Sequence, residues 1–160
     1  MLVLVMGVAG SGKTLIGRML ADSLGWRFAD ADDFHPTANL EKMSQGIPLT
    51  DADREPWLEN MRHAISGWMD SGENVVLACS ALKQRYREQL TRGCESKVVY
   101  LKGDFELIYG RLAARHNHFM KPEMLASQFA DLEEPVEAMT IDVSSAPEQI
   151  VAQLRKTLSQ

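Results

Sequence analysis

Short, continuous apolar runs alternate along the chain with segments whose apolar residues recur at helical spacing. The runs predict five strands, in chain order at residues 2–6, 27–29, 75–79, 98–101 and 140–143. Helical spacing is found at residues 15–24, 57–68 and 150–158, and Gly72 can end the second of these helices. Strands separated by helices favour right-handed crossovers, so the pattern predicts an α/β fold with a parallel sheet and helices on both of its faces.

The first apolar run leads into Gly7-Val8-Ala9-Gly10-Ser11-Gly12-Lys13-Thr14, which matches the phosphate-loop pattern G-x-x-x-x-G-K-[ST] at every fixed position. Its glycines allow a backbone whose N–H groups converge on phosphate oxygens. Lys13 supplies a cation for the β and γ phosphates, and the Thr14 hydroxyl can ligate Mg²⁺. A glycine-rich turn without a ligand would not need the adjacent Lys-Thr pair. The sequence therefore predicts a site for ATP with Mg²⁺, formed by Gly7, Gly10, Ser11, Gly12, Lys13 and Thr14.

Composition narrows the class of protein. The 160 residues suffice for one domain with a buried core, which we place at 1–160. A net charge of −5 argues against a broad nucleic-acid or membrane surface, and the first apolar run is too short to span a bilayer. Cys79 and Cys94 lack metal-ligand spacing and are too few for a disulfide scaffold. These features indicate a reducing compartment, and we expect a cytoplasmic protein.

An acidic segment, Asp30-Ala31-Asp32-Asp33-Phe34-His35-Pro36, follows the second predicted strand. Ligands of parallel sheets bind outside the carboxyl ends of the strands, so this segment is expected beside the phosphate loop. We expect Asp30 to reach the Mg²⁺ shell, Asp32 to accept or orient a hydroxyl proton, and His35 to add a hydrogen bond. Asp33, beside Asp32, leaves open which carboxylate is the base. The alternative is a solvated acidic loop that caps the next helix.

Basic residues after the later strands are candidate partners for anions. Arg54 could bind a carboxylate in bidentate fashion, although solvation at the surface also explains a lone arginine. Lys83 and Arg87 are four residues apart, so we expect them on one helix face that meets an anion.

Two further arginines, Arg111 and Arg115, precede the segment His116-Asn117-His118-Phe119. Their position suits a lid, at about residues 115–125, that closes over the transferring phosphates. Arg115 would stabilise the developing charge, and Arg111 could lie on the adenine ring, in a pocket between Arg111 and the turn at 144–147. The alternative is an exposed helix end where cations complement the dipole. The two histidines lack the spacing of a helix-borne zinc site.

Motifs over nearly the whole chain resemble the gluconokinase family of the small phosphate-loop type. They are the phosphate loop and residues 30–36, 46–51 with 54–57, 79–83 with 86–87, 100–104, and 128–129 with 132–135. The loop alone is shared with many unrelated NTPases, whereas the later motifs in this order and spacing are specific to that family.

The resemblance implies ATP-dependent phosphorylation of the 6-hydroxyl of D-gluconate to 6-phosphogluconate. It also implies a nucleoside- or shikimate-kinase-like P-loop fold with a five-stranded sheet, a helical substrate-binding region at about 36–70, a mobile lid and a homodimer. Matching positions assign roles to eight residues: Lys13 and Thr14 for phosphate and Mg²⁺, Asp32 and His35 for substrate hydroxyls, Arg54, Lys83 and Arg87 for the substrate or its carboxylate, and Arg115 for the lid.

Two alternatives remain open. A related small-metabolite kinase such as shikimate kinase would show a glycine-rich turn after the third strand, where this chain has Ser80-Ala81-Leu82-Lys83. A regulatory module that binds ATP without transferring phosphate would leave the polar groups at the strand ends idle. An assay of ADP release with a panel of sugar acids separates these readings.

Overall fold

The computed structural model describes residues 1–114 and 121–159. Five parallel strands form one sheet in the order β2-β3-β1-β4-β5. Their bounds are Leu2–Met6 (β1), Arg27–Asp30 (β2), Val75–Ala78 (β3), Ser96–Lys102 (β4) and Met139–Asp142 (β5). The predicted α/β class, the parallel sheet and all five strand positions are confirmed. β4 is longer than predicted because its first residues, Ser96 and Lys97, interrupt the apolar run but still pair with β1.

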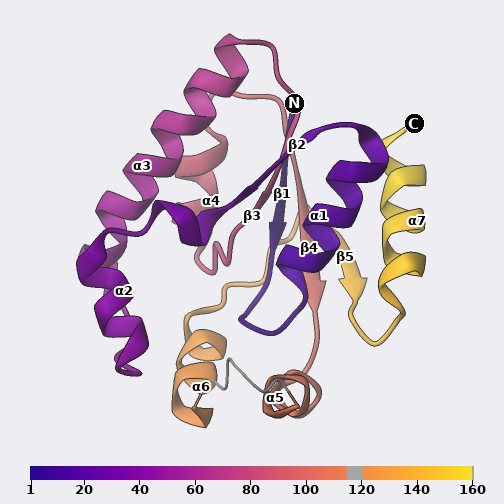
Figure 1. Ribbon diagram of the computed structural model, residues 1–160. Coiled ribbons are helices and arrows are strands. Elements are labelled where there is room, and N and C mark those ends of the chain that lie inside the picture. Colours follow the sequence, from indigo (N-terminus) through magenta and orange to yellow (C-terminus); the bar gives the residue numbers. More distant parts are fainter. Residues whose placement is uncertain (115–120, 160) are drawn as a thin grey trace.

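Helices cover both faces of the sheet (Figure 1). On one face, α1 (Lys13–Leu24) and α7 (Pro147–Leu158) pack through apolar residues such as Leu20 and Leu154. On the other face, α3 (Asp51–Asp70) and α4 (Gln84–Thr91) pack through Met61, Ile65 and Leu90. The sheet is therefore covered by apolar residues on both faces, and β1 is buried along its whole length. This burial explains why the strands appear in the sequence as continuous apolar runs.

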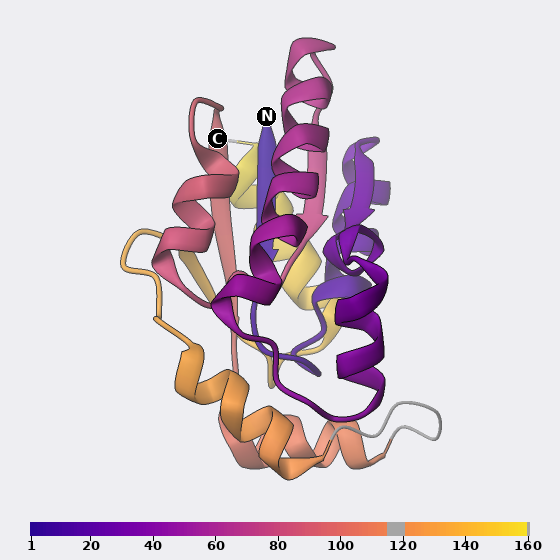
Figure 2. The ribbon, with the colours of Figure 1, turned by 90° about the vertical axis from the view of Figure 1, so that its left-hand side faces the viewer.

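Three further helices and a short 3₁₀ turn lie toward the carboxyl ends of the strands. The 3₁₀ turn η1 (Ala31–Phe34) leads into α2 (Thr37–Ser44), and α5 (Phe105–Ala113) and α6 (Pro122–Asp131) cross below the sheet (Figures 1 and 2). A third apolar cluster, which includes Val8, Ile108 and Leu125, joins α5 and α6 to the phosphate loop.

The start and end of α3 follow local chemistry that the sequence shows. Thr50 Oγ1 accepts a hydrogen bond from the Asp53 N–H at 3.1 Å, and Asp53 Oδ2 accepts one from the Thr50 N–H at 2.9 Å. This reciprocal capping box fixes the first turn, where Pro56 is tolerated. After the last residue, Gly72 takes a φ of 72° and ends the helix, as predicted.

Candidate active site

The phosphate loop joins β1 to α1 at the carboxyl edge of the sheet. Gly10 and Gly12 have φ values of 82° and 98°, which residues with a β-carbon rarely adopt. A β-carbon on Gly10 would lie 2.7 Å from the side chain of Leu112 in α5. Glycine at this position therefore provides the loop conformation and also permits the close approach of α5.

The interior of the loop has the polar groups that a phosphate chain requires. Ser11 is 2% exposed, and its Oγ has no hydrogen-bond partner among the residues that the structure describes. An unsatisfied buried hydroxyl costs about 1–3 kcal/mol, which a phosphate oxygen would offset. Lys13 Nζ donates to the Val8 carbonyl oxygen at 3.1 Å, so the ammonium lies against the same loop. The loop fits the triphosphate that its sequence predicts.

Thr14 and Asp30 form a hydroxyl–carboxylate pair beside the loop. Thr14 Oγ1 donates to Asp30 Oδ2 at 3.0 Å, and Asp30 Oδ1 accepts the Asp32 N–H at 2.9 Å. Mg²⁺ prefers such oxygen ligands together with water and phosphate oxygens. Within residues 1–114 and 121–159, no group of three or more His, Cys, Asp or Glu side chains could hold a metal by itself. The pair therefore fits a Mg²⁺ that arrives with the nucleotide.

Asp32 lies in the centre of the charges at this edge. Partial burial raises the pKa of its carboxyl, Asp30 and Asp33 raise it further, and the Lys13 ammonium opposes them. A carboxylate with a raised pKa and access to solvent is a better proton acceptor near neutral pH. The charge of Lys13 acts on Asp32, which is consistent with the predicted position of the acidic segment beside the phosphate loop.

His35 is held as a neutral ring. Burial and the nearby Arg54 guanidinium lower the pKa of His35 to about 4. The ring stacks on Trp57 with centroids 4.5 Å apart, and its Nδ1 lies 3.2 Å from Nδ2 of Asn39. Trp57 is itself fixed, because its Nε1 donates to the Ala31 carbonyl oxygen at 2.8 Å.

The structure brings two of the three predicted substrate cations together. Arg54 donates to Tyr86 Oη and to Asp131 Oδ2, each at 3.1 Å. Lys83 Nζ donates to Asp51 Oδ1 at 2.9 Å, and Asp51 also lies 3.9 Å from Arg54. Arg54 and Lys83 therefore lie at one place, between α3 and the start of α4.

The expectation that Arg87 shares a substrate-facing surface with Lys83 is wrong. Lys83 is the N-cap residue of α4, outside its first turn, so the spacing of four does not place the two side chains together. Arg87 is 3% exposed, and its guanidinium donates to carbonyl oxygens of Ala81, Leu82 and Glu133 at 2.7–3.1 Å. The N–H groups of Arg87 therefore hydrogen-bond to the protein backbone and stabilise the loop after β3, so they do not face a substrate.

Arg111 lies where α5 meets the turn after β5. One of its terminal nitrogens donates to the Val143 carbonyl oxygen at 2.5 Å. The structure thus places Arg111 next to the turn at 144–147. The predicted adenine pocket lies between this arginine and that turn. Arg115, the predicted lid arginine, and residues 116–120 lie outside the described residues.

Sequence reasoning assigned no role to Gln128, which contacts the phosphate loop. Gln128 Oε1 accepts the Ala9 N–H at 2.7 Å, across 119 positions of sequence. It also assigned none to Asn39, which is 3% exposed and whose Nδ2 donates to the Asp53 carbonyl oxygen at 2.8 Å. The sequence signal for Gln128 was the Gln128-Phe129 motif. The signal for Asn39 was its position soon after the acidic segment.

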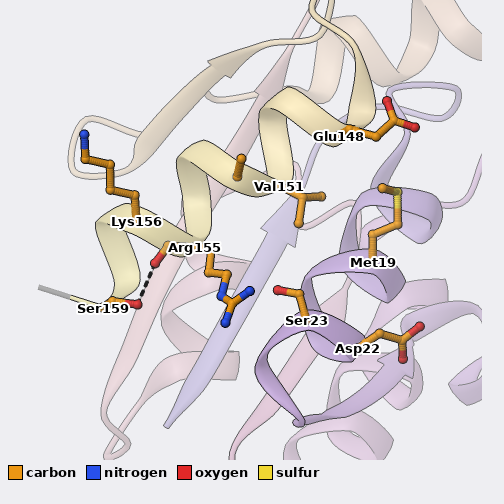
Figure 3. Close-up of a pocket in the computed structure, with 9 residues that line it drawn as sticks. Met19, Asp22, Ser23, Glu148, Val151, Arg155, Lys156 and Ser159 are labelled. Carbon is orange, nitrogen blue, oxygen red and sulfur yellow. Dashed lines mark hydrogen bonds between the residues drawn. The ribbon is translucent and has the colours of Figure 1, made fainter.

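A cavity of about 830 Å³ lies away from these residues, between α1 and α7 (Figure 3). Met19 and Val151 line it together with the charged side chains of Asp22, Glu148 and Arg155. None of the predicted site residues lines it. The cavity lies between helices on one face of the sheet and not at the carboxyl ends of the strands. We therefore do not assign the phosphoryl transfer to this cavity.

The fold and the site together define a P-loop kinase of the shikimate-kinase-like class. The phosphate loop follows β1, the acidic segment follows β2, and the sheet has the order 2-3-1-4-5 with helices on both faces. Comparisons with known proteins agree. The shikimate kinase family profile matches residues 9–159. A probable gluconokinase of Rattus norvegicus is 46% identical, over 93% of this chain and 86% of its own. The thermosensitive gluconokinase of Escherichia coli strain K12 is 41% identical, over 97% and 86%.

A solved structure gives the same result. The crystal structure of a gluconokinase from Sinorhizobium meliloti 1021 superposes with a TM-score of 0.83 at 38% identity, over 98% of this chain and 94% of the other. The chain belongs to the gluconokinase family, within the shikimate-kinase-like group of ATP-using P-loop kinases.

Proposed function

We propose that this protein transfers the γ-phosphoryl group of ATP to the 6-hydroxyl of D-gluconate, giving 6-phospho-D-gluconate and ADP. The observation on which this rests is the order of three adjacent strands. β1, β3 and β2 lie side by side, and their carboxyl ends lead to the phosphate loop, Lys83 and Asp32 respectively. A triphosphate and a polyol acid can therefore meet at one edge of the sheet.

Each part of the site has a defined task in an in-line transfer. The phosphate loop and Lys13 hold the β and γ phosphates, and Thr14 and Asp30 hold Mg²⁺, which supplies neutralising charge when bound. Asp32 accepts or orients the proton of the attacking hydroxyl. His35, neutral and fixed on Trp57, hydrogen-bonds a second hydroxyl.

The substrate carboxylate requires a fixed cation, which Arg54 and Lys83 supply. Lys83→Ala should raise the KM for gluconate about 10-fold and leave the KM for ATP within 2-fold, in a coupled assay of ADP release. Equal effects on both KM values would remove Lys83 from the substrate site. ADP release with shikimate but not gluconate would reject the proposed substrate.

Arg111 is proposed to flank the adenine beside the 144–147 turn, and Arg115 to act from the lid. A homodimer remains a prediction that light scattering of the purified protein tests. Cytoplasmic location also remains a prediction. Among the described helices, none is long and apolar enough to cross a membrane.

A further inference from the structure

Four side chains, from α3 and from α4 with its N-cap residue, converge on the carboxylate of Asp51, in the first turn of α3. Lys83 Nζ lies 2.9 Å from its Oδ1 and Arg85 2.6 Å from its Oδ2. Tyr86 Oη donates a hydrogen bond to Oδ1, and Arg54 lies 3.9 Å from the same oxygen. We call these five residues the Asp51 cluster. The three cations also surround the ring of Tyr86, at 5.3–5.9 Å from its centroid.

The stability of α3 does not require Asp51 and Arg85 to be paired in this way. The N-terminus of α3 is capped by Thr50 and Asp53, so Asp51 is not required for that purpose. The side chains of Asp51 and Arg85 are 46% and 57% exposed, and exposed ion pairs typically contribute only about 0–1 kcal/mol. The Asp51–Arg85 pair therefore adds little stability, which suggests that Arg85, the third cation of the cluster, has a role toward a ligand.

The charges of the cluster favour one additional anion. Arg54, Lys83 and Arg85 face two carboxylates, that of Asp51 and that of Asp131, which pairs with Arg54 at 3.1 Å. One positive charge is therefore unmatched in this part of the described structure. The cluster adjoins the proposed substrate site, because Trp57, three residues after Arg54 in α3, stacks on His35 with ring centroids 4.5 Å apart.

We propose that Asp51 is a positioning residue for a carboxylate subsite, in which it gathers Lys83, Arg85 and Tyr86 beside Arg54 to recognise the carboxylate of a sugar acid. This inference rests on the proposed function and adds Arg85 as a further specificity-determining residue. Without Asp51, three like charges would repel one another and separate. A neutral polyol of the same length offers no charge to this subsite, so the cluster selects acids over neutral alcohols.

Asp51→Asn tests the proposal, because it keeps the shape of the side chain and removes its charge. We expect the KM for D-gluconate to rise about 10-fold while kcat and the KM for ATP stay within 2-fold. The preference for D-gluconate over the neutral D-glucitol, as a ratio of kcat/KM values, should fall about 10-fold. Asp51→Glu should recover most of the KM. A lower KM in Asp51→Asn would mean that Asp51 competes with the substrate, which overturns the proposal, and so would an unchanged KM.

A second variant and a matched control guard against loss of the fold. Arg85→Gln, at an exposed position, should raise the KM for D-gluconate about 5-fold without lowering the unfolding temperature. Glu73→Gln breaks the exposed Arg27–Glu73 pair at the opposite edge of the sheet and should change neither KM. If wild-type protein does not phosphorylate D-gluconate, the proposed function fails. If it does, and neither Asp51→Asn nor Arg85→Gln shifts the KM, only this inference fails.

Discussion

Asp32 differs from the two other carboxylates of its segment in the charges that it faces. Asp30 is committed to Thr14 and to the backbone of the 3₁₀ turn. Burial raises the pKa of Asp32, the charges of Asp30 and Asp33 raise it further, and the Lys13 ammonium opposes them. The raised pKa supports Asp32 as the proposed proton acceptor, and the choice between Asp32 and Asp33 stays a prediction for mutagenesis.

Asp32→Asn should lower kcat by about 100-fold or more, because a positioned base typically contributes 10²–10⁴-fold. The affinity for ATP should remain nearly unchanged, since the phosphate loop and Lys13, rather than the Asp32 carboxylate, are proposed to hold the phosphates. Steady-state kinetics and calorimetric titration of a nonhydrolysable ATP analogue measure the two quantities. A normal turnover rate would exclude Asp32 as the base, and Asp33→Asn serves as the neighbouring control.

His35 predicts a pH dependence of stability. Its pKa is about 4 in the folded protein and 6.5 as a free side chain, so the unfolded state binds the proton more readily between these values. The free energy of unfolding should therefore fall as the pH drops from about 6.5 to 4, by on the order of 1 kcal/mol after allowance for solvent screening. Asp32, whose pKa is raised, makes the free energy of unfolding change with pH in the opposite direction. The contribution of His35 must therefore be measured as a difference between wild type and a variant that lacks His35.

Urea denaturation of wild type and His35→Gln at pH 7 and pH 4.5 isolates this contribution. The difference in unfolding free energy between the two proteins should shrink or reverse at the lower pH. A difference that is the same at both pH values would mean that His35 is not buried as a neutral ring.

Among the elements, the loop after β3 has an unusual backbone conformation, and Arg87 stabilises it. Ala81 has a φ of 43°, the one positive value at a non-glycine position among the described residues, and its carbonyl oxygen accepts from Arg87. The tail after α6 reinforces the same loop, because the Glu133 N–H donates to the Leu82 carbonyl oxygen at 2.7 Å. This loop carries Lys83 at its end, so its shape determines where that ammonium lies.

Arg87→Met should lower the free energy of unfolding by about 3 kcal/mol, because several buried carbonyl oxygens lose their donor. Arg85→Met is the matched control, two positions earlier on the same helix but exposed, and should cost about 0–1 kcal/mol. Chemical denaturation of both variants measures the contrast. Equal costs would contradict the structural role of Arg87.

The elements themselves were largely predictable from the sequence, and the mistakes have physical causes. Strands buried on both faces require continuous apolar runs, and 2–6 and 75–79 display them. The phosphate loop was predictable because its chemistry is local. The role of Arg87 was not, since one of its acceptors, the Glu133 carbonyl oxygen, lies 46 positions away. The contact of Gln128 with Ala9 likewise depends on how α6 crosses the sheet, which local periodicity does not encode.

At the scale of the whole molecule, the ligand sites share one edge of one sheet. Nothing in the described sheet separates the phosphate loop from the acidic segment into independent units, because β1 and β2 both pair with β3. We therefore expect a single unfolding transition that any ligand of the folded state shifts as a whole.

A nonhydrolysable ATP analogue with Mg²⁺, at about 100 times its Kd, should stabilise the fold by about 2.7 kcal/mol. For a domain of this size, the unfolding temperature should rise by roughly 5–10 °C. Thr14→Ala should lose the part of this rise that depends on Mg²⁺ and keep the part that does not, in scanning fluorimetry with and without EDTA. A full Mg²⁺-dependent rise in the variant would separate Thr14 from the metal.

The end of α6 and the tail that follows it contact both halves of the site. Gln128 contacts the phosphate loop, Asp131 pairs with Arg54, and Glu133 supports the loop that ends in Lys83. A substitution anywhere in this stretch should therefore disturb the nucleotide and the sugar acid together. Evolution of a new acceptor preference in this enzyme would have to begin elsewhere, at side chains such as Arg85, if nucleotide affinity is to be preserved.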